Sequence, residues 1–171
     1  MKSFSLALLV GIGLASAAVA ATPLTTPALN NQGAEIGQIT FTPAKTGILI
    51  RISLKPGALP PGWHGMHLHA VGDCGDIAAF KNAKAHVTHG KGMHGLLNAE
   101  GPEDGDLPNL HAAADGSAEA EVFTRTVGLS DGPSMLLDQD GSALVIHTDE
   151  DDQMSQPIGN SGVRLVCAVL K

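Results

Sequence analysis

The sequence predicts an all-β fold, a β-sandwich or flattened β-barrel that carries two long functional loops. Short apolar stretches alternate with polar residues at the two-residue period of a strand, and Gly- and Pro-rich turns separate them. No stretch shows the 3.6-residue period of a long amphipathic helix. The 171 residues include 21 Gly and 10 Pro, so turns are frequent enough for a sheet of short antiparallel strands.

The first twenty residues have the composition of a secretory signal peptide. Lys2 supplies the positive start, residues 6–19 are apolar, and Ala18-Val19-Ala20 places small residues at a cleavage position. The apolar stretch is too short and too rich in Ala and Gly for a good membrane span. We expect an exported protein without a membrane anchor after cleavage, periplasmic or otherwise secreted.

Domain organisation follows from the remaining composition. Residues 21–33 are rich in Pro, Thr and Asn without periodicity, and we expect a flexible segment there. Residues 34–171 have the length of one domain. Removing Lys2 with residues 1–20 leaves 9 Lys and Arg against 17 Asp and Glu, a net charge of −8. This charge argues against nucleic acid as a partner.

The strands are expected in a fixed order along the domain. A hairpin comes first, because isoleucines alternate with polar residues on both sides of the turn at 43–47. Residues 71–110 then form a long irregular loop, and residues 149–162 form a second one. The other expected strands are 62–70, 118–126, 142–148 and 163–170.

Histidines gather around these loops. His67 and His69 lie two residues apart on a strand and therefore share a face, whereas His64 has the opposite parity and is expected to be structural or solvent-facing. Imidazole and carboxylate ligands without thiolate favour Cu(II) or Zn. The other candidates are His86, His89, His94, Glu103, Asp104, Asp106 and His147. Two cysteines in an exported chain indicate a disulfide.

Five segments, in this order, resemble the copper/zinc superoxide dismutase family of the exported bacterial kind. They are PPGWHGMHLHAVGDC, GDLPNL, ADGSAEAEV, GSALVIH and GVRLVC, and the resemblance runs from Gly37 to Leu170. It implies a Greek-key, immunoglobulin-like sandwich and an enzyme that dismutates superoxide to oxygen and hydrogen peroxide with copper and zinc. Exported relatives include monomers and dimers, so a homodimer stays open.

The resemblance also implies a role for individual residues. His86 bridges the two metals, Asp151 ties the copper and zinc histidines together, and Cys74 pairs with Cys167. Arg164 attracts and orients superoxide beside the copper and, with His86, is the expected catalytic residue. The implied copper ligands are His67, His69, His86 and His147, and the implied zinc ligands are His86, His94 and Asp106.

The sequence departs from the family where a third zinc histidine is usual, because Glu103 stands there. Three alternatives follow: Glu103 binds zinc, His89 replaces the missing ligand, or the zinc site is weak or empty. The acidic residues 149–152 beside His147 would oppose an anionic substrate. These departures motivate a rival hypothesis, a copper-binding or copper-buffering protein with little or no dismutase activity.

Overall fold

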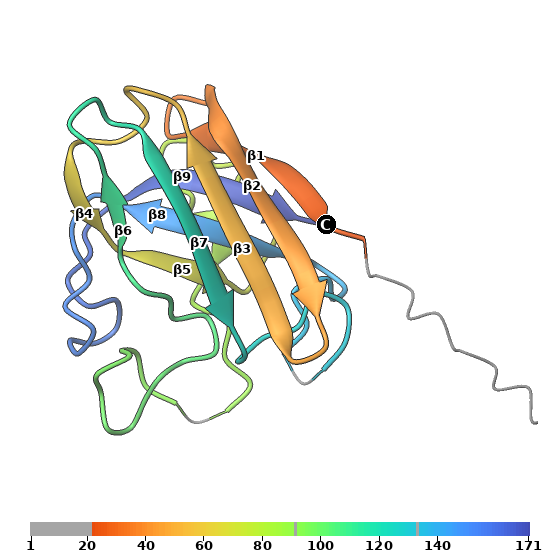
Figure 1. Ribbon diagram of the computed structural model, residues 1–171. Coiled ribbons are helices and arrows are strands. Elements are labelled where there is room, and N and C mark those ends of the chain that lie inside the picture. The colour runs from red at the N-terminus through yellow and green to blue at the C-terminus, as the bar shows by residue number, and fades with distance from the viewer. Residues whose placement is uncertain (1–21, 91, 133) are drawn as a thin grey trace, which may run out of the picture.

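A computed structural model describes residues 22–90, 92–132 and 134–171, and the predicted signal peptide lies outside them. The described residues form strands and one short 3₁₀ helix, η1 (Figure 1). Among them, no helix has the length and hydrophobicity needed to cross a membrane. The elements are β1 (Leu24–Asn30), β2 (Glu35–Ala44), β3 (Gly47–Leu54), β4 (Gly62–His64), β5 (Met66–His69), η1 (Lys81–Ala83), β6 (Leu110–Ala112), β7 (Ala118–Thr124), β8 (Ser142–His147) and β9 (Arg164–Leu170).

Seven strands form one curled antiparallel sheet in the order β5-β8-β9-β1-β2-β3-β7. The remaining two, β4 and β6, pair with each other in a short ribbon. Strand β4 leads directly into β5 and β6 lies beside β7, so the ribbon connects the two edge strands of the large sheet (Figure 1). This arrangement is the predicted all-β sandwich or flattened barrel. Because β5 and β8 are antiparallel, the first long loop leaves this strand pair after His69 at one end and the second leaves after His147 at the other.

The predicted hairpin is present as β2 and β3, but two other expectations need correction. Residues 24–30 of the expected flexible segment form β1, which pairs with β2 along its length and with β9 at Leu29 and Asn30. The expected strand at 62–70 is broken at Gly65. A β-carbon at Gly65 would lie 2.7 Å from the Ser161 side chain and 3.1 Å from that of Asp151, so the second long loop packs closely at this break.

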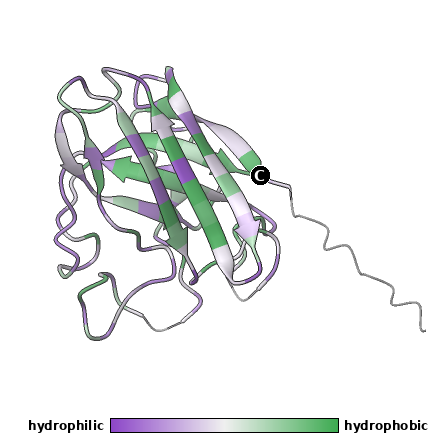
Figure 2. Cartoon of the chain, in the orientation of Figure 1, coloured by the Kyte–Doolittle hydropathy of each residue, from purple (hydrophilic) through white to green (hydrophobic). Residues whose placement is uncertain are grey.

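The core lies between the curled layers of the sheet. On β3 the isoleucines at positions 48, 50 and 52 are fully buried, while Arg51 between them is exposed. The same alternation places Leu68 of β5 and Leu144 of β8 in this core. Figure 2 shows the hydrophobic residues concentrated in strands such as β3 and β8. A smaller apolar cluster surrounds the Cys74–Cys167 disulfide on the other face of β8 and β9.

Candidate metal centre

Strand pairing brings the predicted ligands of different segments together. His67 and His69 lie on β5, which pairs with β8 so that His67 is opposite Val145. His147 ends β8 after a bulge and lies opposite Arg164 of β9. Isolated bridges then join the first long loop to β5, with His69 opposite His86 and His67 opposite Asp106. The backbone pairing of β5, β8 and the first long loop therefore places these residues next to one another.

The ligand atoms form two adjoining groups. Those of His67, His69 and His147 lie within 4.8 Å of one another, and so do those of His67, His86, His94 and Asp106. His86 stacks on His67 with ring centroids 4.1 Å apart, and its ring is 5.0 Å from that of His69. All these residues are buried. His86 therefore lies between the two groups.

One nitrogen of each predicted copper histidine is buried without a hydrogen-bond partner among the described residues. The four atoms are His67 Nδ1, His69 Nε2, His86 Nε2 and His147 Nε2. Buried polar atoms without partners are rare in native proteins, so four of them in neighbouring rings form a donor set that suits a metal ion.

The opposite nitrogen of each of these rings is engaged. His69 donates through Nδ1–H to the carbonyl oxygen of Lys84 at 2.8 Å, and His147 donates to that of Gly162 at 3.2 Å. His67 donates through Nε2–H to Asp151 Oδ2 at 2.7 Å. These bonds fix each proton on the far nitrogen and leave the orphan nitrogen with a lone pair. The donor set fits copper, for which imidazole is a suitable ligand.

Apart from His67, which it shares with the first group, the second group consists of the imidazoles of His86 and His94 and the carboxylate of Asp106, and the Glu103 carboxylate joins them. His86 Nδ1 lies 2.8 Å from Glu103 Oε2 and 3.2 Å from Asp106 Oδ1. His94 Nδ1 lies 2.8 Å from Asp106 Oδ1 and 3.9 Å from Glu103 Oε2. The same nitrogen and oxygen atom types are ordinary zinc ligands. Glu103 therefore lies at the cluster, with its side chain 19% exposed.

Asp151 connects the two groups from behind. Its Oδ2 accepts a hydrogen bond from His67, and its Oδ1 lies 3.1 Å from His94 Nε2. Asn109 holds the backbone of Asp151 through both its N–H and its C=O. Gly159, with φ of +57°, passes so close that a β-carbon would collide with the Asp151 carboxylate. Outer contacts of this type orient metal-binding histidines.

The two groups differ in their protonation. Burial lowers the pKa of His67 to about 4 and that of His147 to about 3, and it also lowers the pKa of His69. Burial acts on His94 in the same direction, but hydrogen bonds to Asp106 and Asp151 outweigh it and raise its pKa to about 10. His67, His69 and His147 are therefore neutral at pH 7, as metal ligands must be.

Carboxylates have the same effect on His86. Its pKa is raised, because hydrogen bonds to Asp106 and Glu103 outweigh burial. Although burial alone would raise the pKa of Asp106, hydrogen bonds from His86 and His94 hold it well below its ordinary value. The Asp106 carboxylate is therefore ionised at pH 7 and paired with ring N–H groups, whose protons a bound cation would displace.

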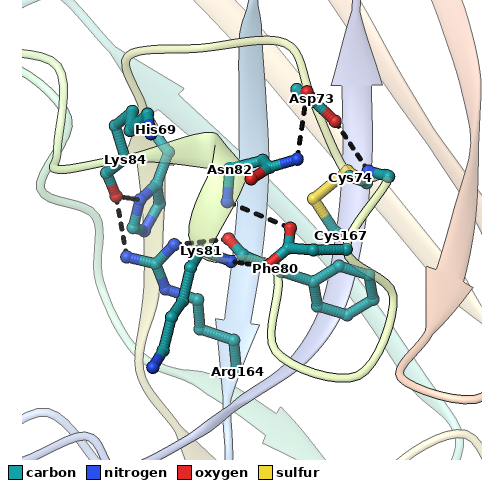
Figure 3. Close-up of a disulfide and its surroundings, with 11 residues drawn as sticks. His69, Asp73, Cys74, Phe80, Lys81, Asn82, Lys84, Arg164 and Cys167 are labelled. Atoms are coloured by element: carbon teal, nitrogen blue, oxygen red, sulfur yellow. Dashed lines mark hydrogen bonds between the residues drawn. A yellow bond between two sulfur atoms is a disulfide. The ribbon is translucent and has the colours of Figure 1, made fainter.

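Arg164 lies at the mouth of the site. It donates to the carbonyl oxygens of Phe80 and Lys84, and the Lys84 carbonyl is the same one that His69 uses (Figure 3). Arg164 borders two cavities, of about 380 and 350 Å³, that open beside His147 and beside His86. Lys81 lines both cavities and Lys84 lines the second. Three cationic side chains therefore line the approach to the histidines, together with the carboxylate of Glu103 in the second cavity.

Other predicted residues lie outside the cluster. His89 is exposed and its Nδ1 is 3.9 Å from Asp104, so the structure does not bring it to the second group. His64 is buried, with its two ring nitrogens 2.8 Å from the carbonyl oxygens of His147 and Pro60, which agrees with the structural alternative. Asp152 is exposed, and hydrogen bonds from Ser155 and Met154 lower its pKa to about 2.

Sequence reasoning missed several supporting groups. The carbonyl oxygens of Phe80, Lys84 and Gly162 orient Arg164, His69 and His147, but every residue has a carbonyl and no sequence signal marks these. Asn109 follows Pro108 in the GDLPNL segment, and a search for polar residues near the aspartates would have found it.

Comparison with known proteins places the chain in a family. A family model described as copper/zinc superoxide dismutase (SODC) matches residues 35–170. The chain is 47% identical to a superoxide dismutase [Cu-Zn] of Caulobacter vibrioides over 142 residues, 81% of this chain and 80% of the relative. It is 40% identical to superoxide dismutase [Cu-Zn] 1 of Aquifex aeolicus over 145 residues, covering 84% of each chain.

A solved structure extends the comparison to three dimensions. The crystal structure of a SOD-like protein from Bacillus subtilis has a TM-score of 0.81 at 32% identity, covering 86% of this chain and 97% of that one. The fold, the order of the five sequence segments and the convergence of their histidines thus lead to one conclusion. The chain belongs to the copper/zinc superoxide dismutase family.

Proposed function

We propose that this protein dismutates superoxide at a copper centre held by His67, His69, His86 and His147. The observation that carries the proposal is the set of four buried, unpartnered ring nitrogens, one from each of these residues. Their opposite nitrogens are fixed by Asp151, by two backbone carbonyls and, for His86, by carboxylates. A ligand that accepts four lone pairs is a metal ion, and the donor set fits copper.

Zinc fits the second group. His86, His94, Asp106 and Glu103 would hold it through the atoms that already lie close to one another. We infer that Glu103 replaces the usual histidine, because its carboxylate lies at the cluster whereas His89 is exposed. His86 would then belong to the residues that hold copper and to those that hold zinc.

Bound copper would supply the one-electron redox chemistry by which one superoxide is oxidised to oxygen and the next is reduced to peroxide. The protein residues supply charge and protons. Arg164 presents a guanidinium at the mouth and attracts the anion, and Lys81 and Lys84 add positive charge to the same approach. His86 Nε2 is placed to hold one of the two protons that convert peroxide to hydrogen peroxide.

We also propose that the protein works outside the cytosol. Residues 1–20 have the composition of a signal peptide. The Cys74–Cys167 disulfide supports the same location, because disulfides persist in oxidising compartments such as the periplasm.

The test is superoxide turnover by residues 21–171 loaded with copper alone and with copper plus zinc. We expect turnover with copper, and we expect His147→Ala to abolish it while His111→Ala, at an exposed histidine on β6, leaves it unchanged. Stoichiometric copper binding without turnover would instead support the rival function of copper buffering. The resemblance to a protein named only SOD-like makes this control necessary.

A further inference from the structure

We propose that Glu103 holds His86 in its copper-binding tautomer by accepting a hydrogen bond from Nδ1–H, so that the copper site forms independently of zinc. This inference rests on the proposed copper centre. It assigns Glu103 a positioning role that is distinct from zinc ligation, although the same carboxylate oxygen would serve both.

The first step concerns the proton of the His86 ring. A neutral imidazole has one N–H and one lone pair, so Nε2 can bind a metal only when the proton sits on Nδ1. The hydrogen bond made by the other nitrogen decides between the two tautomers. His67, His69 and His147 each have one such acceptor at Asp151, Lys84 and Gly162, respectively.

For His86 the closer acceptor is Glu103. The Nδ1 atom lies 2.8 Å from Glu103 Oε2, against 3.2 Å from Asp106 Oδ1. Asp106 is already engaged, because its Oδ1 lies 2.8 Å from His94 Nδ1 and its Oδ2 accepts the backbone N–H groups of Gly95 and Glu103. The oxygens of Asp106 are thus shared among several donors, and Glu103 supplies His86 with a closer acceptor of its own.

The composition of the second group supports this role. Two ring N–H donors, on His86 and His94, meet two carboxylates, so each donor has its own acceptor. A histidine at position 103 would add a third ring and remove one carboxylate. Three rings would then share Asp106, and a cation would be needed to satisfy the nitrogens left over.

The segment that carries Glu103 is anchored by protein contacts. Asp104 accepts hydrogen bonds from Ser134 Oγ at 2.8 Å and from the backbone N–H of His89 at 2.9 Å. The backbone of Gly105 bonds to Leu68 of β5 at 2.8 Å and to Val87 at 2.9 Å. These bonds hold the Glu103 segment against β5, in addition to the bond from the Glu103 N–H to Asp106 Oδ2.

The experiment measures Cu(II) affinity of the zinc-free protein by competition with a chelator, together with the Cu(II) EPR spectrum. We expect wild-type copper affinity to change less than threefold when zinc is added. Glu103→Ala should weaken copper binding 10- to 100-fold in the zinc-free protein, the usual cost of removing an outer hydrogen-bond partner. Its EPR spectrum should show the loss of one nitrogen ligand. Glu100→Ala, at an exposed glutamate of the same loop, is the matched control.

Two conservative variants separate hydrogen bonding from zinc ligation. Glu103→Gln keeps an acceptor oxygen without the charge, so it should retain copper affinity but weaken zinc binding. Glu103→His should lose copper affinity in the zinc-free protein and regain it when zinc is added. Far-UV circular dichroism verifies that each variant is folded. If the alanine variant does not fold, the comparison of Glu103→His with Glu103→Gln in the zinc-free protein tests the same loss of copper affinity, and equal affinities would contradict the inference.

Defined results would overturn the inference. Equal copper affinity of wild type and Glu103→Ala without zinc would leave Glu103 as a zinc ligand or a surface residue. A tenfold or larger gain in wild-type copper affinity on adding zinc would also contradict it. A wild-type protein that fails to bind copper at all would instead refute the proposed function.

Discussion

Removing the Cys74–Cys167 disulfide should lower the free energy of unfolding and also loosen the loop that holds Arg164 beside the metal centre. The bond joins residues 93 positions apart, so it closes a loop through most of the domain. The chain-entropy relation for a loop of this length gives about 4.6 kcal/mol. For a domain of this size that corresponds to a fall in Tm of about 10 to 20 °C.

The assay is thermal and urea unfolding of the oxidised protein, the reduced protein and the double variant Cys74→Ser/Cys167→Ser. Both cysteines are buried, so serine adds a cost of its own, and the reduced wild type isolates the effect of the crosslink. The loop that starts at Cys74 also carries the carbonyls of Phe80 and Lys84 that hold Arg164 (Figure 3). Superoxide turnover should therefore fall along with stability. A loss of less than about 1 kcal/mol in the reduced protein would refute the entropic reasoning.

Three further predictions concern individual residues. Asp151→Ala should weaken copper binding by about 10- to 100-fold, because His67 loses the acceptor that fixes its tautomer, and chelator competition measures this. Arg164→Gln should lower kcat/KM for superoxide by about tenfold with copper affinity unchanged, because it removes a charge that attracts the anion and no metal ligand; unchanged kcat/KM would contradict this. The metal-free protein should lose stability as the pH falls from about 6.5 to about 3, since the pKa values of His67 and His147 fall from 6.5 to about 4 and about 3 on folding. The unfolded chain then binds more protons in that range, which acid titration followed by circular dichroism can verify.

Much of the fold could be predicted from the sequence where one face of a strand is buried and the other is not. The isoleucines of β3 alternate with polar residues, and the structure buries them in the same alternation. Strand β1 gave no such signal, because Thr25, Thr26 and Pro27 interrupt the pattern. Strand β1 pairs with β9 only from Leu29 onward. Pro27 therefore lies outside this pairing, and its missing N–H removes no hydrogen bond between β1 and β9.

The metal-ligand candidates were readable because histidine spacing and the order of the segments are properties of the sequence. The choice between Glu103 and His89 was not, because it depends on how the first long loop folds. Asp104 decides it by bonding to Ser134, thirty residues further along the chain, and to the backbone of His89. Glu103 thus lies against His86 while His89 is exposed, and no local pattern in the sequence records a contact between residues so far apart.

The core and the metal centre use opposite faces of the same two strands. On β5, Met66 and Leu68 enter the core, and the two histidines point to the opposite face. On β8, Leu144 enters the core and His147 lies on the face of the metal centre. A shift of one residue in the β5–β8 register would exchange the faces and bury imidazoles among aliphatic side chains. Core packing therefore fixes the register, and the register fixes where three of the four orphan nitrogens lie. The fourth lies on His86 of the first long loop, where a backbone bridge to His69 places the residue and Glu103 Oε2 lies 2.8 Å from its Nδ1.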